Sequence, residues 1–451
     1  MSNSLFEQFQ TTTAAAWKQK IQVDLKGADY NDTLLWKSDE GITVKPFYTK
    51  EDRKGEDSTE KEFDFNISQS IFISDPTIAN TIATNALKKG ANAIEFIAAE
   101  KFDYQTVFNS IDLSKTLIYL RFQFLDTTFI NEVHNYLDSE NCYIQVDIIN
   151  KLAGTGNWFE NINNDFSNFK SIVNNCTNSI GIDSTLYQNA GATITQQLAY
   201  TLAHANEYLN HFEQDDISAK FHFTFAMGSN YFFEIAKLKA FKQLWELLLK
   251  EYNYSTDHVH IFAQPSLRNK TIYDYNTNML RTTSECMSAI LGGATTVNNL
   301  SYDAVYHKKN EFGERIARNQ LLILQQESAL ESANTVVNGS YYIENLTHQF
   351  AEKALSIFKT IEQGGGFLKQ LKDGKIQKKI EESATQEQEK FDNQEIVLLG
   401  TNKLSNQNDK MQEEIEFYPF VKTNIIKTLI PPIINKRLSE NYESNRLKEE
   451  K

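Results

Sequence analysis

The stretch that decides the fold is Phe65–Ala98, FNISQSIFISDPTIANTIATNALKKGANAIEFIA. Residues 65–72 are strand-like, and Ser74-Asp75-Pro76 then supplies cap candidates and a proline suited to a first helical turn. The residues after the proline predict a helix, and 93–98 predict a second strand. This strand, helix and strand form one βα unit of a parallel sheet.

The same unit recurs outward from this stretch, about every twenty-five to forty residues. Because eight such units in one continuous run favour a closed barrel over an open sheet, we expect a (β/α)8 TIM barrel. The candidate strands are Phe65–Phe72, Ala93–Ala98, Leu117–Phe124, Tyr143–Ile149, Ser179–Tyr187, Phe221–Met227, Val259–Gln264 and Thr295–Leu300.

The ends of the chain do not follow this repeat. Residues 1–60 are expected to be an N-terminal partner-binding arm with a charged linker, and residues 61–400 the barrel with its covering helices. Three helical stretches, 311–329, 343–363 and 377–394, should cover the outside of the barrel. Residues 401–451 should form a polar loop and a C-terminal tail, whose apolar patch 425–434 docks and whose last residues fray.

Composition excludes several classes of protein. The chain has 451 residues and a formal net charge of −14, which disfavours binding to nucleic acid or to an anionic membrane. Its three cysteines show no CxxC spacing, so neither a disulfide framework nor a thiolate metal site is expected. No apolar run approaches the roughly twenty residues that span a bilayer, and no targeting sequence is evident. We therefore expect a cytoplasmic protein.

Polar residues interrupt several predicted strands at alternate positions. Parallel strands buried on both faces are normally apolar throughout, so these residues should point into the barrel. Two interpretations stay open: long side chains fill the lumen and pair with one another, which we favour, or they line a channel for a ligand. The residues are Glu95, Arg121, Gln123, Gln145, Asp147, His222 and Thr224.

Short motifs give little evidence of chemistry. His258-x-His260 has a spacing that could bind a metal, but it lies at the beginning of a strand, so packing or exposure is favoured. The glycines 364–366 follow a helix and favour a helix end over a phosphate loop. At the carboxyl ends of strands, 187–189, 227–229 and Gln264 include no usual general base. The barrel is therefore either without a reactive site or dependent on a cofactor.

Several motifs, in order along roughly four hundred residues, resemble the methylmalonyl-CoA mutase family. Each is weak alone, and their common order and spacing carry the resemblance. They are Leu25-Lys26-Gly27, Gly41–Tyr48, Asn189-Ala190-Gly191-Ala192, Met227–Lys237, Asn278–Thr283, Leu291-Gly292-Gly293, Ala317-Arg318-Asn319, Leu324–Ser328 and Asn338–Glu344.

The resemblance implies an acyl-CoA-binding barrel and a separate cobalamin domain, which together interconvert succinyl-CoA and methylmalonyl-CoA. None of the eight histidines stands in the Asp-x-His-x-x-Gly motif that ligates cobalt in the family. Ser70 takes the place of a tyrosine that active subunits carry, and Leu186 takes the place of a histidine that binds the thioester carbonyl. His260 stands where an arginine is expected. The resemblance thus implies no catalytic, cofactor-binding or metal-binding residue in this chain.

The chain is therefore predicted to be a non-catalytic, stabilising small subunit of an isomerase, in a heterodimer with a larger catalytic subunit that binds adenosylcobalamin. Such an obligate interface typically buries over about 2,000 Å². Bulky lumen residues argue against acyl-CoA binding by this chain. Two alternatives remain: the substrate-binding subunit of a split mutase, and a regulator that senses acyl-CoA without converting it.

Overall fold

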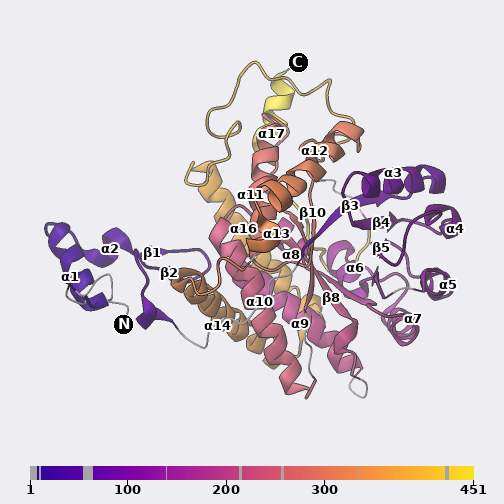
Figure 1. Ribbon diagram of the computed structural model, residues 1–451, viewed down its shortest axis with the longest axis horizontal. Helices are drawn as coiled ribbons and strands as arrows, with labels where there is room; N and C mark the ends of the chain where they lie inside the picture. Colours follow the sequence, from indigo (N-terminus) through magenta and orange to yellow (C-terminus); the bar gives the residue numbers. More distant parts are fainter. Residues whose placement is uncertain are drawn as a thin grey trace.

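A computed structural model describes residues 8–9, 12–53, 64–138, 140–212, 216–254, 259–333, 335–421 and 426–450 (Figure 1). Its main sheet has eight strands in the order β6-β5-β4-β3-β10-β9-β8-β7, and every paired neighbour is parallel. The strands are β3 Asn66–Phe72, β4 Ala93–Ala98, β5 Leu117–Phe122, β6 Cys142–Gln145, β7 Ile180–Asp183, β8 Phe221–Met227, β9 His260–Pro265 and β10 Thr296–Asn298.

The sheet curls into a nearly closed barrel. The backbone N–H of Ile144 in β6 donates to the carbonyl of Asn178, just before β7, at 2.9 Å. This bond brings together the two ends of the strand order, so the predicted (β/α)8 barrel is confirmed. The helices of the repeat are α3 Pro76–Lys88, α4 Tyr104–Val107, α5 Thr127–Leu137, α6 Ile148–Thr155, α7 Ile162–Asn175, α8 Thr185–Ala190, α9 Ile194–His211, α10 Tyr231–Glu251, α11 Thr277–Leu291 and α12 Glu311–Leu322.

Four predicted strands end earlier than expected. The strand expected over 117–124 ends at Phe122, so Gln123, which was predicted to face the lumen, follows the strand and is exposed, and the strand expected over 295–300 ends at Asn298. The strand expected over 143–149 ends at Gln145, because the Asp147 carboxylate accepts the N–H of Asn150 at 2.9 Å and starts α6. The strand expected over 179–187 ends at Asp183, and α8 begins at Thr185. Segment 187–189 therefore lies in a helix above the strand end.

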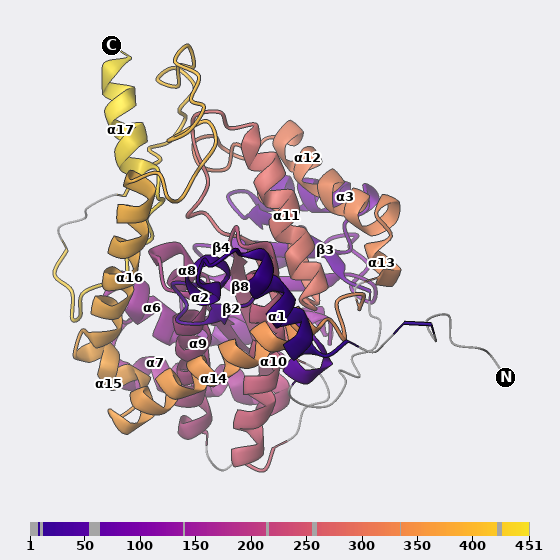
Figure 2. The same ribbon diagram turned by 90° about the vertical axis from the view of Figure 1, so that its left-hand side faces the viewer.

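Outer helices cover one side of the barrel, as predicted. α12 continues as a π-helical turn, Ile323–Glu327, and is followed by α13 Leu330–Ala333, α14 Tyr341–Gln363, α15 Phe367–Lys372 and α16 Lys375–Asp392. Figure 2 shows α14, α15 and α16 following one another along the outside of the barrel. The three glycines end α14, and the N–H of Gly366 donates to the carbonyl of Ile361 at 3.1 Å. The helix-end interpretation is confirmed.

The N-terminal arm extends away from the barrel (Figure 1). It contains α1 Ala14–Asp24, α2 Tyr30–Leu34, a small antiparallel hairpin of β1 Trp36–Lys37 and β2 Thr43–Val44, and a 3₁₀ turn, Lys50–Asp52. None of the α1 residues is buried. Ile42, by contrast, is only 2% exposed and belongs to the main apolar core, so the hairpin anchors the arm to the barrel.

The apolar patch of the C-terminal tail docks on this chain's own barrel, within its described residues. Ile430 and Ile433 are buried in the main core. The N–H of Ile430 donates to the carbonyl of Gly156 at 3.2 Å, and that of Ile433 to Ala153 at 2.7 Å. The predicted docking is therefore confirmed, and its surface is the end of α6.

The expectation that the last residues fray is wrong for residues 440–450. They form α17 Glu440–Glu449, whose buried Glu443 pairs with the equally buried Arg437 at 2.6 Å. The carboxylate of Glu450 accepts the N–H groups of Met411 and Gln412 at 2.9 and 3.0 Å. These charged contacts hold the tail in place, although its apolar content is low.

The helices of the described part of the chain are short or carry many polar residues. None of them combines the length and the apolar character needed to cross a membrane.

Candidate functional site

Aromatic side chains fill the middle of the barrel lumen. The ring of Tyr143 stacks on His260 with centroids 4.0 Å apart. The Tyr119 hydroxyl lies 2.6 Å from Nε2 of His260 and 2.7 Å from the Thr296 hydroxyl, and Phe262 packs against the Tyr119 ring. Burial raises the pKa of Tyr119 well above its usual value, which keeps the phenol neutral.

A charge bridge crosses the lumen nearer the carboxyl ends of the strands. Arg121 of β5 donates from Nε to Glu95 of β4 at 2.8 Å and from a terminal nitrogen to Asp183 of β7. The Ser70 hydroxyl donates to the other oxygen of Glu95. Burial alone would raise the pKa of Glu95, but the Arg121 charge and these hydrogen bonds hold it below its usual value. Glu95 therefore stays ionised and paired.

Tight packing completes the filling of the lumen. The Gln145 amide donates to the Thr224 hydroxyl at 3.3 Å, and Nε2 of His222 lies 3.0 Å from the carbonyl of Ile144. A Cβ atom built on Gly181 would lie 2.6 Å from the His222 ring. The filled-lumen interpretation is thus confirmed for these residues, and a ligand could enter this space only if they moved.

Ser70 and Leu186, two of the three positions predicted from the resemblance, are not brought together. Ser70 lies in β3 and faces the lumen, where Glu95 holds its hydroxyl. Leu186 lies in α8 after β7, is 8% exposed, and packs beside Gly154 of α6. In the strand order, β3 and β7 stand on opposite sides of the barrel. The charge bridge runs between these two sides.

A buried network that the sequence did not reveal adjoins the barrel at α9. Nε2 of His204 and the Tyr208 hydroxyl both lie 2.9 Å from the Asp147 carboxylate, and the Tyr187 hydroxyl lies 3.0 Å from Nδ1 of His204. His204, Tyr187 and Tyr208 are fully buried. Because solvent cannot reach them, the arrangement holds α9 against β6 and does not form an open catalytic relay. Asp147 was expected in the lumen, and the structure corrects this: it caps α6.

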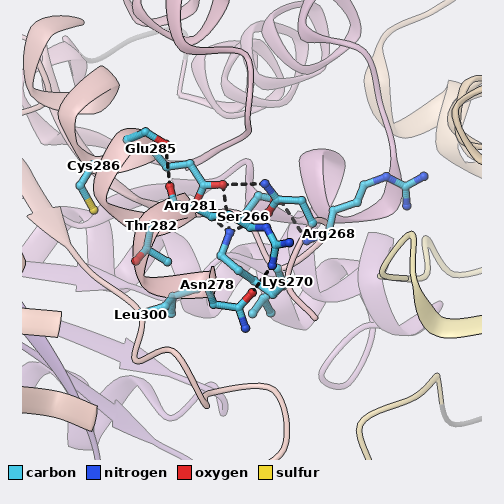
Figure 3. Close-up of polar contacts among 12 residues, drawn as sticks. Ser266, Arg268, Lys270, Asn278, Arg281, Thr282, Glu285, Cys286 and Leu300 are labelled. Carbon is cyan, nitrogen blue, oxygen red and sulfur yellow. Dashed lines mark hydrogen bonds and ion pairs between the residues drawn. The ribbon is translucent and has the colours of Figure 1, made fainter. Parts of the chain in front are cut away.

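A second buried polar cluster joins the loop after β9 to α11 (Figure 3). The ammonium of Lys270 contacts both oxygens of Glu285 at 3.0 and 2.7 Å, and the Asn269 amide donates to the same carboxylate at 2.6 Å. Burial lowers the pKa of Lys270 and raises that of Glu285. Arg281, from the motif Asn278–Thr283, donates to Thr271 at 2.9 Å. This motif therefore has a structural role in the fold.

A cavity of about 190 Å³ lies at the barrel rim, where the segments after β7 and β8 meet the N-terminal arm. Gln188 and Gly228 line it, so two segments predicted from sequence, 187–189 and 227–229, do come together. Glu40 of the arm also lines it, and burial raises the pKa of this carboxyl to about 7. No local sequence pattern marks Glu40, because its contact with Ile194 joins residues far apart in the chain.

The described residues contain no group of three or more His, Cys, Asp or Glu that could hold a metal ion. Of the predicted His258-x-His260 pair, His258 lies outside the described residues, and His260 is engaged with Tyr119 and Tyr143.

Comparison with known proteins gives consistent matches. The family model described as methylmalonyl-CoA mutase matches residues 101–431. The methylmalonyl-CoA mutase small subunit of Porphyromonas gingivalis is 29% identical over 99% of this chain and 78% of its own length. The large subunit from the same organism is 32% identical over 50% of this chain and 33% of its own length. A methylmalonyl-CoA mutase of Rhizobium meliloti is 37% identical over 52% of this chain, and the match spans only 34% of that protein.

Proposed function

The chain belongs to the methylmalonyl-CoA mutase family, and from this premise we propose that it is a non-catalytic small subunit that stabilises a larger, adenosylcobalamin-binding subunit. The observation that carries the proposal is the charge bridge from Glu95 through Arg121 to Asp183. It lies across the barrel axis, where a substrate arm would have to pass. Ser70 and Leu186, which lack the expected phenol and imidazole, give independent support.

We propose that this chain does not hold adenosylcobalamin, because none of its eight histidines stands in the Asp-x-His-x-x-Gly motif that ligates cobalt in the family. Three histidines of the barrel region, His204, His222 and His260, are buried with polar partners, which also argues against cobalt binding inside the barrel. We therefore assign the cofactor to the partner and derive no chemical step from it in this chain. We also propose a cytoplasmic location, supported only by the composition.

Two observations support a heterodimer. The Porphyromonas gingivalis relatives include a protein named as a small subunit and another named as a large subunit. In this chain, α1 buries none of its residues, and Trp17 on that helix is 47% exposed. An exposed aromatic residue on an extended arm is typical of a partner-binding segment. We propose that the arm contacts the larger subunit.

The test is calorimetric titration of the isolated chain with succinyl-CoA, together with a turnover assay containing adenosylcobalamin. We expect neither heat of binding nor turnover. The Ser70→Tyr/Leu186→His double variant should stay inactive as well, because Arg121 still closes the lumen. Activity of that variant would refute the argument from the lumen, and turnover by the unmodified chain would refute the non-catalytic assignment.

The same experiment separates the alternatives. Binding of succinyl-CoA without turnover would favour an acyl-CoA-sensing regulator. Turnover that appears only when a separate cobalamin-binding protein is added would favour a substrate-binding subunit of a split mutase.

A further inference from the structure

One wall of the rim cavity is formed by Gly228, directly after β8. A Cβ atom built on this glycine would lie 3.0 Å from Nε2 of Gln188 and 3.1 Å from Oε1 of Glu234, and both side chains also line the cavity. Glu234 is only 2% exposed, so protein encloses it on its other sides. The missing side chain therefore leaves an amide nitrogen and a carboxylate oxygen, which we call the rim pair, facing the same small space.

A series of hydrogen bonds determines which end of the Gln188 amide faces Gly228. The ammonium of Lys237 can only donate, and it contacts Oε1 of Gln197 at 3.2 Å, so Nε2 of Gln197 is a donor. This nitrogen donates to the carbonyl of Ala192 at 2.8 Å and to Oε1 of Gln188. The end of Gln188 that faces Gly228 is therefore its NH₂ group, which offers hydrogen-bond donors.

The same lysine makes Glu234 an acceptor. Lys237 is fully buried, donates to the carbonyl of Ala226 at 2.7 Å and forms an ion pair with Oε2 of Glu234 at 2.5 Å. A carboxylate that is paired with a buried ammonium accepts hydrogen bonds at both oxygens, and Oε1 is the one that faces Gly228. Neither atom of the rim pair has a hydrogen-bond partner among the residues that the structure describes.

Two other carboxylates of the cavity wall are already occupied. The oxygens of Glu40 accept the N–H groups of Ile194 and Thr195 at the start of α9, both at 2.9 Å. Glu387 of α16 pairs with Arg268 at 2.6 Å. The rim pair is thus a place where the cavity still offers one donor and one acceptor close together.

The cavity also has an aromatic wall. Trp36 of the arm stacks on Phe233 of α10 with centroids 5.3 Å apart, and both line the cavity. Its volume is about 190 Å³. Since a cavity of about 150 Å³ holds benzene, there is room for a single ring with a short substituent. Flat apolar side chains beside a few fixed polar groups are typical of small-molecule sites.

We propose that the rim cavity binds a small, neutral, one-ring molecule whose substituent both accepts and donates a hydrogen bond, as a carboxamide or a hydroxyl group does. The substituent accepts an N–H of Gln188 and donates to Oε1 of Glu234, and the ring packs beside Trp36 and Phe233. A carboxylate on the same ring lacks the donor and is repelled by Glu234. This inference does not depend on the proposed function.

The test is saturation-transfer magnetic resonance of the full chain at pH 7 with two probes, benzamide and benzyl alcohol. Each has a matched control that lacks the donor: benzoate and benzyl methyl ether. We expect at least one probe to bind saturably, with a dissociation constant of about 1 mM or tighter. Its control should bind at least about tenfold more weakly, because a hydrogen bond to a charged group is lost. The probe that binds better identifies the substituent.

Two variants assign the binding to the rim pair. Gly228→Ala should abolish it, because the new Cβ atom fills the space between the two atoms. Gly154→Ala is the matched control: its Cβ atom would meet only Leu186, at 3.6 Å, and binding should be unchanged. Gln188→Glu keeps the acceptor for Gln197 but replaces the donor with a carboxylate oxygen, so it should weaken binding at least about tenfold. Thermal unfolding checks that each variant is folded.

Three outcomes would overturn the proposal. The first is that neither probe binds saturably up to about 20 mM, far above the expected constant. The second is that each probe and its matched control bind equally well, which would mean that the rim pair does not recognise the substituent. The third is that binding survives unchanged in Gly228→Ala or in Gln188→Glu, which would place the ligand elsewhere on the chain.

Discussion

Asp147 shows how one carboxylate can join three parts of the fold. Its oxygens cap α6 through the N–H of Asn150, accept hydrogen bonds from His204 and Tyr208 of α9, and accept the N–H of Asp183 in β7 at 3.1 Å. The side chain is only 4% exposed. Loss of its charge would leave several buried donors without a strong acceptor.

Asp147→Asn should destabilise the protein by roughly 2–4 kcal/mol at pH 7. Burial alone would raise the pKa of Asp147, but the His204 charge and hydrogen bonds hold it below its usual value. A lowered pKa stabilises the fold above pH 3.8, and this stabilisation is lost as pH falls through the lowered value. Urea unfolding at pH 7 and pH 3 should therefore show a smaller difference between wild type and variant at pH 3.

Asp126→Asn is the control, because Asp126 also caps a helix, by accepting the N–H of Phe129 at 2.9 Å, but is 31% exposed. Its cost should be about 1 kcal/mol or less. If the two substitutions cost the same, the buried network contributes nothing beyond capping.

The sequence predicts lumen residues well and strand ends poorly, for one physical reason. Glu95 and Arg121 interrupt apolar strands at alternate positions, and both face the lumen as expected. Asp147 continues the same alternation after Gln145, yet it caps a helix. A polar residue two positions after Gln145 can be the next lumen-facing residue of a strand or the cap of a following helix. The sequence does not distinguish these cases, and only the pairing of β6 with its neighbours decides where the strand ends.

At the scale of elements, the tail docks through two of its isoleucines. Ile433 is 4% exposed, whereas the adjacent Ile434 is 51% exposed. Ile433→Ala should lower the free energy of unfolding by roughly 2–4 kcal/mol, because it leaves a cavity between the tail and α6. Ile434→Ala should change it by less than about 0.5 kcal/mol. Thermal unfolding of both variants tests this, and equal effects would mean that the tail does not dock as described.

The anchoring of α17 could not be predicted from the sequence. An apolar patch indicates docking, so the burial of Ile433 was foreseeable. The end of the chain is polar, and the ion pair between Arg437 and Glu443 becomes favourable only because the loop after β9 covers it; there, Arg437 also donates to the carbonyl of Lys270 at 2.9 Å. Such a contact joins segments that are far apart in the sequence and meet only in the folded barrel. It therefore leaves no local pattern in the sequence.

At the scale of the whole molecule, the barrel can be predicted by counting the βα repeats in the sequence. The position at which the N-terminal arm attaches to the barrel cannot be predicted in this way. Eight βα units close a sheet whatever their loops contain. The arm is fixed by Glu40 on α9 and by Ile42 in the core, two single residues without a recurring motif. The sequence therefore predicts the existence of the arm, while its anchoring point is evident only from the structure.

The arm also permits a test of assembly that leaves the barrel intact. Trp17 lies on α1, which buries no residue, and its ring stacks on Phe47 with centroids 4.2 Å apart. If the arm contacts the larger mutase subunit, Trp17→Ala should weaken the complex about tenfold or more, as aromatic residues central to interfaces do. The same change should lower the free energy of unfolding of the isolated chain by less than about 1 kcal/mol, because the ring is 47% exposed.

The affinity is measured by titrating the labelled chain with the larger subunit of the same organism, and Gln19→Ala on the same helix is the control. Equal affinities of Trp17→Ala and wild type would remove the exposed face of α1 from the interface, because the part of the ring not covered by Phe47 is the part a partner would bury.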